Sequence, residues 1–186
     1  GIHRAMQSDY KKMVTAASQD GIDIAIVSGF RDFDRQLSIW NRKVSGQLPV
    51  YDKEQNMVDL STLTEKQAMY AILLYSALPG TSRHHWGTDI DVYSPSALKT
   101  GQTLQLQAWE YEPEGPFSDL HNWLLSHAKT FGFYHPYDLY RGGVSAEPWH
   151  LSYHPIAQQY QAQFDAMTLR KMLSNYPIGL KHEIIK

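Results

Sequence analysis

Two short segments of the chain carry histidines and carboxylates that could bind a metal ion and use it. They read Ser-Arg-His-His-Trp-Gly-Thr-Asp-Ile-Asp at 82–91 and Glu-Pro-Trp-His at 147–150. His84, Asp91 and His150 would supply two imidazoles and a carboxylate, a set that leaves the fourth position of a catalytic zinc ion open for water. Glu147 would serve as the general base. The pattern predicts a zinc hydrolase with one Zn²⁺ ion.

The segment that carries the first two ligands must turn before it becomes a strand. His84 and Asp91 are seven residues apart, which suits one face of a helix, but Pro79-Gly80 and Gly87 argue against a helix there. On a continuous strand the two side chains would point to opposite faces. We therefore expect a turn near Gly87, followed by a strand on which Asp89 and Asp91 share a face. A divalent cation is the simplest group that would stabilise two such carboxylates.

The second segment needs a similar adjustment. In an extended chain Glu147 and His150 would point to opposite sides, and Pro148 can break the regular pairing and turn Glu147 back toward the metal. We expect Glu147 to contact the zinc-bound water and not the zinc. A lone histidine is more often a packed or surface residue, so the prediction depends on the joint occurrence of both segments.

Hydrophobic periodicity predicts the elements that position these segments. Asp32 is a predicted helix cap, and Thr62 with Glu65 resembles a capping box. Residues 47–60 are predicted to form a surface loop. The order favours an α+β fold with a small, mainly antiparallel sheet flanked by helices. The predicted helices cover about 2–17, 32–46, 62–78, 118–130 and 155–173, and the predicted strands cover 22–28, 88–93, 103–109, 133–134 and 149–153.

Composition limits the class of protein. The 186 residues, 42% of them hydrophobic, suit a single domain over 1–186 with a substantial core. A net charge of -2 disfavours nucleic-acid partners. The chain has no cysteine, so any metal must be held by His, Asp or Glu. No apolar run approaches the roughly 20 residues of a membrane span, and the start lacks the order of a signal peptide. Because the chain opens on Gly1 and not Met, the sequence does not decide whether a targeting segment precedes it.

Three motifs, in order, resemble those of a known family. The pairing of the two segments is similar to that of the D-alanyl-D-alanine metallopeptidases, the VanY-type carboxypeptidases and VanX-type dipeptidases of the lysostaphin, D-Ala-D-Ala metallopeptidase and hedgehog superfamily. A third, upstream motif resembles the Ser-Gly-Tyr-Arg signature of the carboxypeptidase branch. The resemblance covers about 22–153. The matching motifs are Ser28-Gly29-Phe30-Arg31 with Gln36, Ser82-x-His84-x-x-Gly87-x-Asp89-x-Asp91, and Glu147-x-x-His150.

The resemblance implies a role for each matching residue. The zinc would lie in a cleft on the sheet, as in hedgehog and D,D-peptidase folds. Arg31 would be a cation that faces the substrate, and Ser82 and Gln36 would contact the substrate or support the site. The implied zinc ligands are His84, Asp91 and His150, with Glu147 as general base and acid.

Asp89 departs from the family pattern, which usually has a small residue there. One interpretation is an acid that accepts a hydrogen bond from a ligand imidazole or from Arg83, because ligating histidines usually have such a partner. The alternative is a substrate-binding residue that meets a cationic group such as the free amine of diaminopimelate. We expect His85 and Trp86 to form cleft wall, and Trp149 to pack beside His150.

The implied activity is a zinc-dependent carboxypeptidase that removes the C-terminal D-alanine from bacterial peptidoglycan stem peptides or muropeptides. The sequence leaves open whether the bond is D,D or L,D, and whether the enzyme works in the cell envelope or the cytoplasm. Loops 47–60 and 100–116 are the expected specificity loops. The alternatives are a peptidoglycan endopeptidase and a non-catalytic zinc- or peptidoglycan-binding module. Arg31 suits a terminal carboxylate and favours an exopeptidase.

Overall fold

The structure is a computed structural model that describes residues 1–186, and its main feature is one four-stranded antiparallel sheet. Two compact units make up the chain. The sheet unit comprises Gly1–Phe30, Trp86–Leu139 and Ala146–Ala162. The helical unit comprises Arg31–His85, Tyr140–Ser145 and Gln163–Lys186. The predicted α+β class with a small antiparallel sheet is confirmed. That all 186 residues act as one domain stays a prediction.

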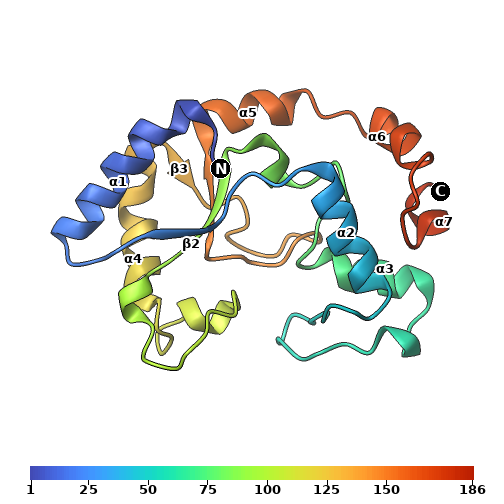
Figure 1. Ribbon diagram of the computed structural model, residues 1–186, viewed down its shortest axis with the longest axis horizontal. Helices are drawn as coiled ribbons and strands as arrows, with labels where there is room; N and C mark the ends of the chain where they lie inside the picture. The colour runs from blue at the N-terminus through green and yellow to red at the C-terminus, as the bar shows by residue number, and fades with distance from the viewer. The chain divides into compact units, whose positions relative to one another are not determined.

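The order of the strands places the two predicted ligand segments next to one another. The sheet runs β1-β2-β4-β3, and each neighbouring pair is antiparallel. The strands β2 and β4, which follow or carry the two segments, are therefore central neighbours (Figure 1). The bounds are β1 (Ala25–Ser28), β2 (Asp89–Tyr93), β3 (Phe133–Tyr134) and β4 (His150–Tyr153).

The register between β2 and β4 separates a polar face from an apolar face. Asp91 lies opposite His150, and Asp89 lies opposite Ser152. Residues that face one another across a ladder point to the same side of the sheet. Ile90, between the two aspartates, therefore points to the other side with its partner Leu151. The expected alternation along 89–93 is confirmed.

The apolar face of the sheet unit is buried against helices. The helices of this unit are α1 (Gln7–Gln19), α4 (Ser118–His127) and α5 (His154–Ala162). The indole of Trp123 in α4 donates to the carboxylate of Asp20, which caps α1, at 2.7 Å and so ties these two helices together (Figure 1). The core includes Met13, Ala17, Ile90, Val92, Leu120, Leu124, Phe133 and Leu151.

The helical unit has a core of its own around Trp40. Its helices are α2 (Phe33–Val44), α3 (Glu65–Leu73), α6 (Ala166–Leu173) and α7 (Lys181–Ile184). Asp32 caps α2 as predicted, because its carboxylate accepts from the backbone N–H of Arg35 at 2.7 Å. Trp40 donates to the Gly179 carbonyl at 2.9 Å, which fixes the segment before α7. The core cluster is Trp40, Val50, Ile72, Leu173 and Ile178.

The predicted helix over 62–78 is shorter than expected and begins at a different cap. Thr64 with Gln67 forms the capping box, since the hydroxyl of Thr62 is bonded back to the Asp59 carbonyl at 2.8 Å. At the other end, the Leu74 carbonyl accepts from the N–H of Ser145 at 2.8 Å. This long-range bond takes the acceptor that a further helical turn would use, and α3 ends at Leu73.

The predicted strand over 103–109 is wrong. The carboxylate of Glu110, which is 1% exposed, accepts from the N–H groups of Gln105 and Gln107 at 3.1 and 3.0 Å. Leu106 between them adopts a left-handed conformation with φ +54°. The backbone donors of this segment therefore bond to a buried side chain and not to a neighbouring strand.

The predicted last helix over 155–173 is also wrong as a single element. It is divided into α5 and α6, because Asp165 caps a new helix by accepting from the N–H groups of Met167 and Thr168. The predicted loop 47–60 lacks helices and strands up to the 3-10 turn at Leu60–Thr62. It is held by a bridge between Tyr51 and Met57, and it buries Val50 in the core.

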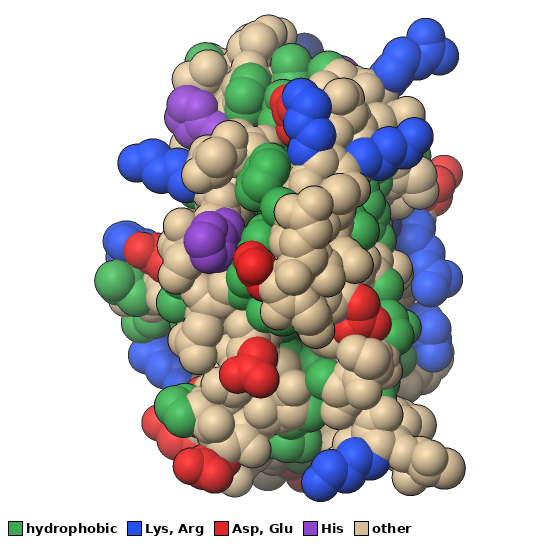
Figure 2. Space-filling model, turned by 90° about the vertical axis from the view of Figure 1, so that its left-hand side faces the viewer, with side chains coloured by type: hydrophobic (Ala, Val, Ile, Leu, Met, Phe, Trp, Pro, Cys, Tyr) green, Lys and Arg blue, Asp and Glu red, His purple; other side chains and the backbone are tan.

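On the face shown in Figure 2, basic and acidic side chains are dispersed and the basic ones lie mostly toward the edges, without a continuous basic patch. No helix combines the length and the apolar character that a bilayer span requires.

His135, which follows β3 in the sheet unit, is a partly buried histidine held in its neutral form. Its Nε2 lies 3.2 Å from the Pro148 carbonyl, and its ring packs edge-on against His121. Burial, together with the nearby His121, lowers the pKa of His135 from 6.5 to about 4, against the opposing effect of the hydrogen bond to Pro148. The unfolded chain therefore takes up this proton at a higher pH than the folded protein does.

The free energy of unfolding should fall as the solution becomes acidic. The contribution of His135 is complete above pH 6.5 and is lost as the pH falls toward about 4. We expect a loss of about 2 kcal/mol from this group between pH 7 and pH 5, measured by denaturant unfolding. His135→Gln keeps a donor near the Pro148 carbonyl and does not titrate. Between pH 7 and pH 5 this variant should therefore lose about 2 kcal/mol less free energy of unfolding than the wild type. Equal losses in both proteins would contradict the prediction.

Candidate metal centre

All three predicted ligands come together. His84, Asp91 and His150 are all buried, and each offers one ligand atom that lies within 4.8 Å of the other two. His84 lies in the 3-10 helix Arg83–Trp86. The turn expected after it is present at Gly87, whose φ of +69° is a conformation that favours glycine.

Asp91 and His150 face one another because they are cross-strand partners in β2 and β4. The Nδ1 atom of His150 lies 3.1 Å from Oδ1 of Asp91. The same Nδ1 lies 3.4 Å from Oε2 of Glu147. A ring nitrogen is thus directed at two carboxylate oxygens, an arrangement that a bound cation would stabilise.

The other nitrogen of His150 is bonded to Asp89. Nε2 lies 2.9 Å from Oδ1 of Asp89, and the second oxygen of Asp89 accepts from the hydroxyls of Thr88 and Ser152 at 2.8 and 3.1 Å. Because a carboxylate in this setting is an acceptor, Nε2 carries the hydrogen. In the neutral ring the lone pair is therefore on Nδ1, on the side of Asp91 and Glu147. Asp89 itself is 0% exposed.

The carboxylates around His150 favour a positive charge at its imidazole ring. Burial alone lowers the pKa of His150, but the hydrogen bonds to Asp89 and Asp91 outweigh burial and raise it to about 10. A divalent metal bound to Nδ1 would use the same surroundings. Two imidazoles and one carboxylate suit zinc. The residues present therefore fit the single Zn²⁺ ion that the sequence predicts.

Glu147 reaches the group by a turn. The N–H of His150 donates to the Glu147 carbonyl at 3.0 Å, and the N–H of Glu147 donates to the Tyr137 carbonyl at 2.9 Å. The turn brings both side chains to the same side, so the opposite orientation expected of an extended chain does not arise. The ring of Tyr137 also packs edge-on against His150, with centroids 5.0 Å apart. Sequence patterns gave no signal for Tyr137.

Arg31 is fixed through its backbone and its side chain. Its N–H donates to the carbonyl of His84 at 3.1 Å. The backbone of Arg31 is therefore bonded to the segment that carries the first predicted ligand. Its guanidinium donates to Oε1 of Gln36 at 2.9 Å. Gln36, 1% exposed, donates in turn to the Ala77 carbonyl at 2.7 Å. The carbonyl of Ser82, which is also buried, accepts from the N–H of His85 at 3.0 Å.

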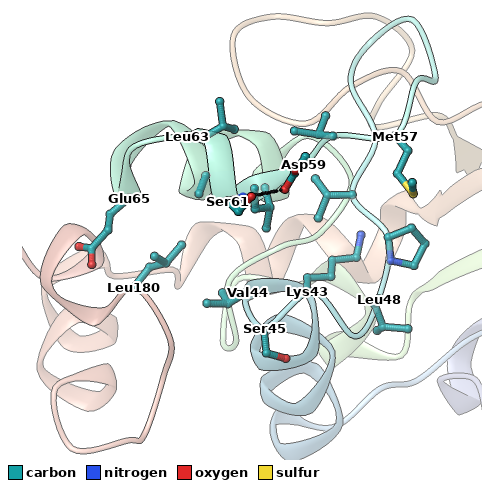
Figure 3. A pocket seen from close by; sticks show the side chains of 16 residues that line it. Lys43, Val44, Ser45, Leu48, Met57, Asp59, Ser61, Leu63, Glu65 and Leu180 are labelled. Atoms are coloured by element: carbon teal, nitrogen blue, oxygen red, sulfur yellow. Dashed lines mark hydrogen bonds between the residues drawn. The ribbon is translucent and has the colours of Figure 1, made fainter.

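Two cavities lie outside the metal group. One of about 570 Å³ lies in the helical unit, between α2 and the loop that carries Met57 and Asp59 (Figure 3). The other, of about 440 Å³, lies in the sheet unit and is lined by Tyr111, Tyr137 and Pro148 among others. Each of the two predicted specificity loops thus lines a cavity. None of the predicted site residues lines either cavity.

The fold and this site define a class of protein. The buried group of His84, Asp91 and His150, with Glu147 beside it, offers two imidazoles and one carboxylate to a single metal ion and leaves a coordination position open. Residues 1–156 match the family of VanY D-alanyl-D-alanine carboxypeptidases. The chain belongs to that family.

Individual relatives match parts or most of the chain. A protein of Haemophilus influenzae is 42% identical over 89 residues, which cover 47% of this chain and 68% of that protein. The D-alanyl-D-alanine carboxypeptidase of Enterococcus faecalis is 26% identical over 162 residues, which cover 86% of this chain. The match spans half, 50%, of the length of the Enterococcus enzyme.

Solved structures share the fold. The vancomycin-resistance D,D-pentapeptidase VanY, a glutamate-to-alanine variant in complex with Zn(II), superposes with a TM-score of 0.59 at 26% identity, over 87% of this chain and 79% of that one. The LD-carboxypeptidase LdcB superposes with a TM-score of 0.52 at 25% identity, over 86% and 72% of the two chains.

Removal of the Asp89 carboxylate should weaken zinc binding. Asp89→Ala takes away the acceptor that keeps the hydrogen on Nε2 of His150, so the Kd for zinc should rise by roughly 10–100-fold. A competition titration with a chromogenic chelator measures this. Asp89→Asn retains an acceptor and should lie between Asp89→Ala and the wild type. Ser152→Ala leaves the bond to His150 in place and should have a smaller effect, while an unchanged Kd in Asp89→Ala would refute the argument.

Proposed function

We propose that this chain is a zinc-dependent carboxypeptidase that removes the C-terminal D-alanine from peptidoglycan stem peptides. The observation that carries the proposal is the buried group of His84, Asp91 and His150 with Glu147 beside it, in a chain of the VanY family. The three ligands and the base are those that the sequence predicts.

The proposed mechanism divides the work between metal and protein. Zinc, when bound by His84, Asp91 and His150, supplies a water of lowered pKa and polarises the scissile carbonyl. Glu147 would take a proton from the attacking water and, as the carbon–nitrogen bond of the peptide breaks, pass it to the leaving amino group. The geometry that supports this role is the turn that directs the Glu147 carboxylate to the ligand side of His150.

Arg31 is the proposed recognition site for the C-terminal carboxylate. A guanidinium matches a carboxylate with two parallel hydrogen bonds. Gln36 holds the guanidinium in one orientation, because its own amide is fixed by the Ala77 carbonyl. Ser82, two residues before His84, is proposed to contact the substrate or to support the site. A requirement for a free carboxylate would make the enzyme an exopeptidase.

The proposed substrate class is shared by the two solved relatives, which act as a D,D-pentapeptidase and an LD-carboxypeptidase. Pentapeptide and tetrapeptide stems both end in D-alanine and differ in the residue before it. The enzyme's preference for the residue before the terminal D-alanine therefore decides whether it cleaves the D,D or the L,D bond. We propose muropeptides and stem peptides as the partners of this chain.

The roles of base and ligand can be separated by substitution. Glu147→Ala should retain zinc and lose hydrolysis by several orders of magnitude, because the proton transfer is lost and the ligands remain. His150→Ala should lose both. Metal content by mass spectrometry and release of D-alanine measure the two effects. A fully active Glu147→Ala protein would rule out the assignment of the base.

Incubation with a pentapeptide and a tetrapeptide muropeptide, with and without chelator, tests the activity. We expect loss of one D-alanine, abolished by chelator and restored by zinc, with mass analysis showing which stem is shortened. Loss of D-alanine in the presence of chelator would refute zinc catalysis. Zinc binding without any cleavage would instead favour a peptidoglycan-binding module, and cleavage within a cross-link would favour an endopeptidase.

A further inference from the structure

We propose that His85 is a positioning residue that fixes Arg31 relative to the metal-ligand segment, and thereby determines selectivity for substrates with a free C-terminal carboxylate. The inference rests on the proposed function, in which Arg31 receives that carboxylate. On this proposal His85 does not contact the substrate; it acts through the backbone of Arg31.

The hydrogen bonds of His85 define its tautomer. The backbone N–H of Gly80 donates to Nε2 of His85 at 3.0 Å, so Nε2 is an acceptor and carries no hydrogen. The hydrogen must then be on Nδ1, which lies 2.6 Å from the carbonyl oxygen of Arg31. Both ring nitrogens are used in one direction: Gly80 donates to His85, and His85 donates to Arg31. The neutral ring is a rigid link between two backbone groups.

The same link clamps the backbone of Arg31 on both sides. Its N–H donates to the carbonyl of His84, and its own carbonyl accepts from the ring of His85. Arg31 lies beyond β1, which ends at Ser28, so the sheet does not hold its peptide groups. Two consecutive histidines of the ligand segment do so instead. The first of them is a predicted ligand, so these two bonds tie the backbone of Arg31 to the ligand segment.

Gly80 supplies the fixed end of the link. Its φ is +90°, and a Cβ atom there would lie 2.5 Å from Cδ1 of Leu169. This left-handed conformation favours glycine, and a side chain there would also require Leu169 to move. Thr81, next in the chain, is bonded back to the Leu78 carbonyl through its hydroxyl at 2.9 Å. Pro79-Gly80, which follows α3 in the chain, therefore also helps to position Arg31 through the ring of His85.

Two amide substitutions separate the two hydrogen bonds. In His85→Asn the amide nitrogen occupies the place of Nδ1 and can donate to Arg31, while the contact with Gly80 is lost. In His85→Gln the amide oxygen occupies the place of Nε2 and can accept from Gly80, while the donor to Arg31 is lost. If His85 acts through Arg31, only His85→Gln should impair recognition of the carboxylate.

The experiment measures binding apart from turnover. Zinc-loaded Glu147→Ala protein, alone and combined with each His85 substitution, is titrated calorimetrically with a stem peptide ending in D-alanine and with its C-terminal carboxamide. We expect His85→Gln to weaken binding of the acid about tenfold and leave binding of the amide unchanged, and His85→Asn to stay within about threefold of its parent. In the otherwise unmodified enzyme, His85→Gln should raise KM with little change in kcat.

Each outcome decides a separate question. If His85→Gln binds the acid as tightly as its parent, the inference is overturned. It is also overturned if both substitutions reduce zinc content and binding of acid and amide alike, because His85 would then serve only to fold the segment. A wild-type protein that distinguishes acid from amide and cleaves neither overturns the proposed activity and leaves the role of His85 intact.

Discussion

The pairing of Asp91 with His150 across β2 and β4 is the constraint on which the site depends. Side chains alternate along a strand, so a slip of one residue in this register would place Ile90 or Leu151 on the polar face and a ligand in the core. The apolar partners Ile90 and Leu151, both 0% exposed, prevent that slip because they must stay buried. The core of the sheet unit thus holds the ligands in register.

This register concentrates negative charge in a buried place. Asp89, Asp91 and Glu147 all approach one imidazole, and each is at most 9% exposed. Buried carboxylates are costly unless hydrogen bonds or a cation compensate them. Thr88 and Ser152 compensate Asp89 with two hydroxyl donors. Asp91 and Glu147 both lie on the Nδ1 side of the ring, where a bound cation would compensate their charge, which is why the group suits a metal.

Backbone hydrogen bonds to side chains shape the parts of the chain that periodicity does not describe. Glu110 takes the donors of 105–107 and prevents a strand, and Asp165 divides the last helix. His85 holds Arg31 by the same kind of bond. In each case one polar side chain satisfies peptide groups that would otherwise require a regular element. Such bonds are local in space and depend on contacts that a hydrophobic pattern does not contain.

The sequence by itself determined the residue types of the metal group, the turn at Gly87, the alternation along β2 and the cap at Asp32, because these depend on spacing and on local geometry. Only the tertiary structure decided which nitrogen of His150 faces the ligands and that Glu147 turns toward it. It also ended α3 at Leu73 through the bond between Leu74 and Ser145, 71 positions further along the chain. These features depend on partners distant in sequence, whose approach is set by the packing of the whole fold and not by the pattern of any one segment.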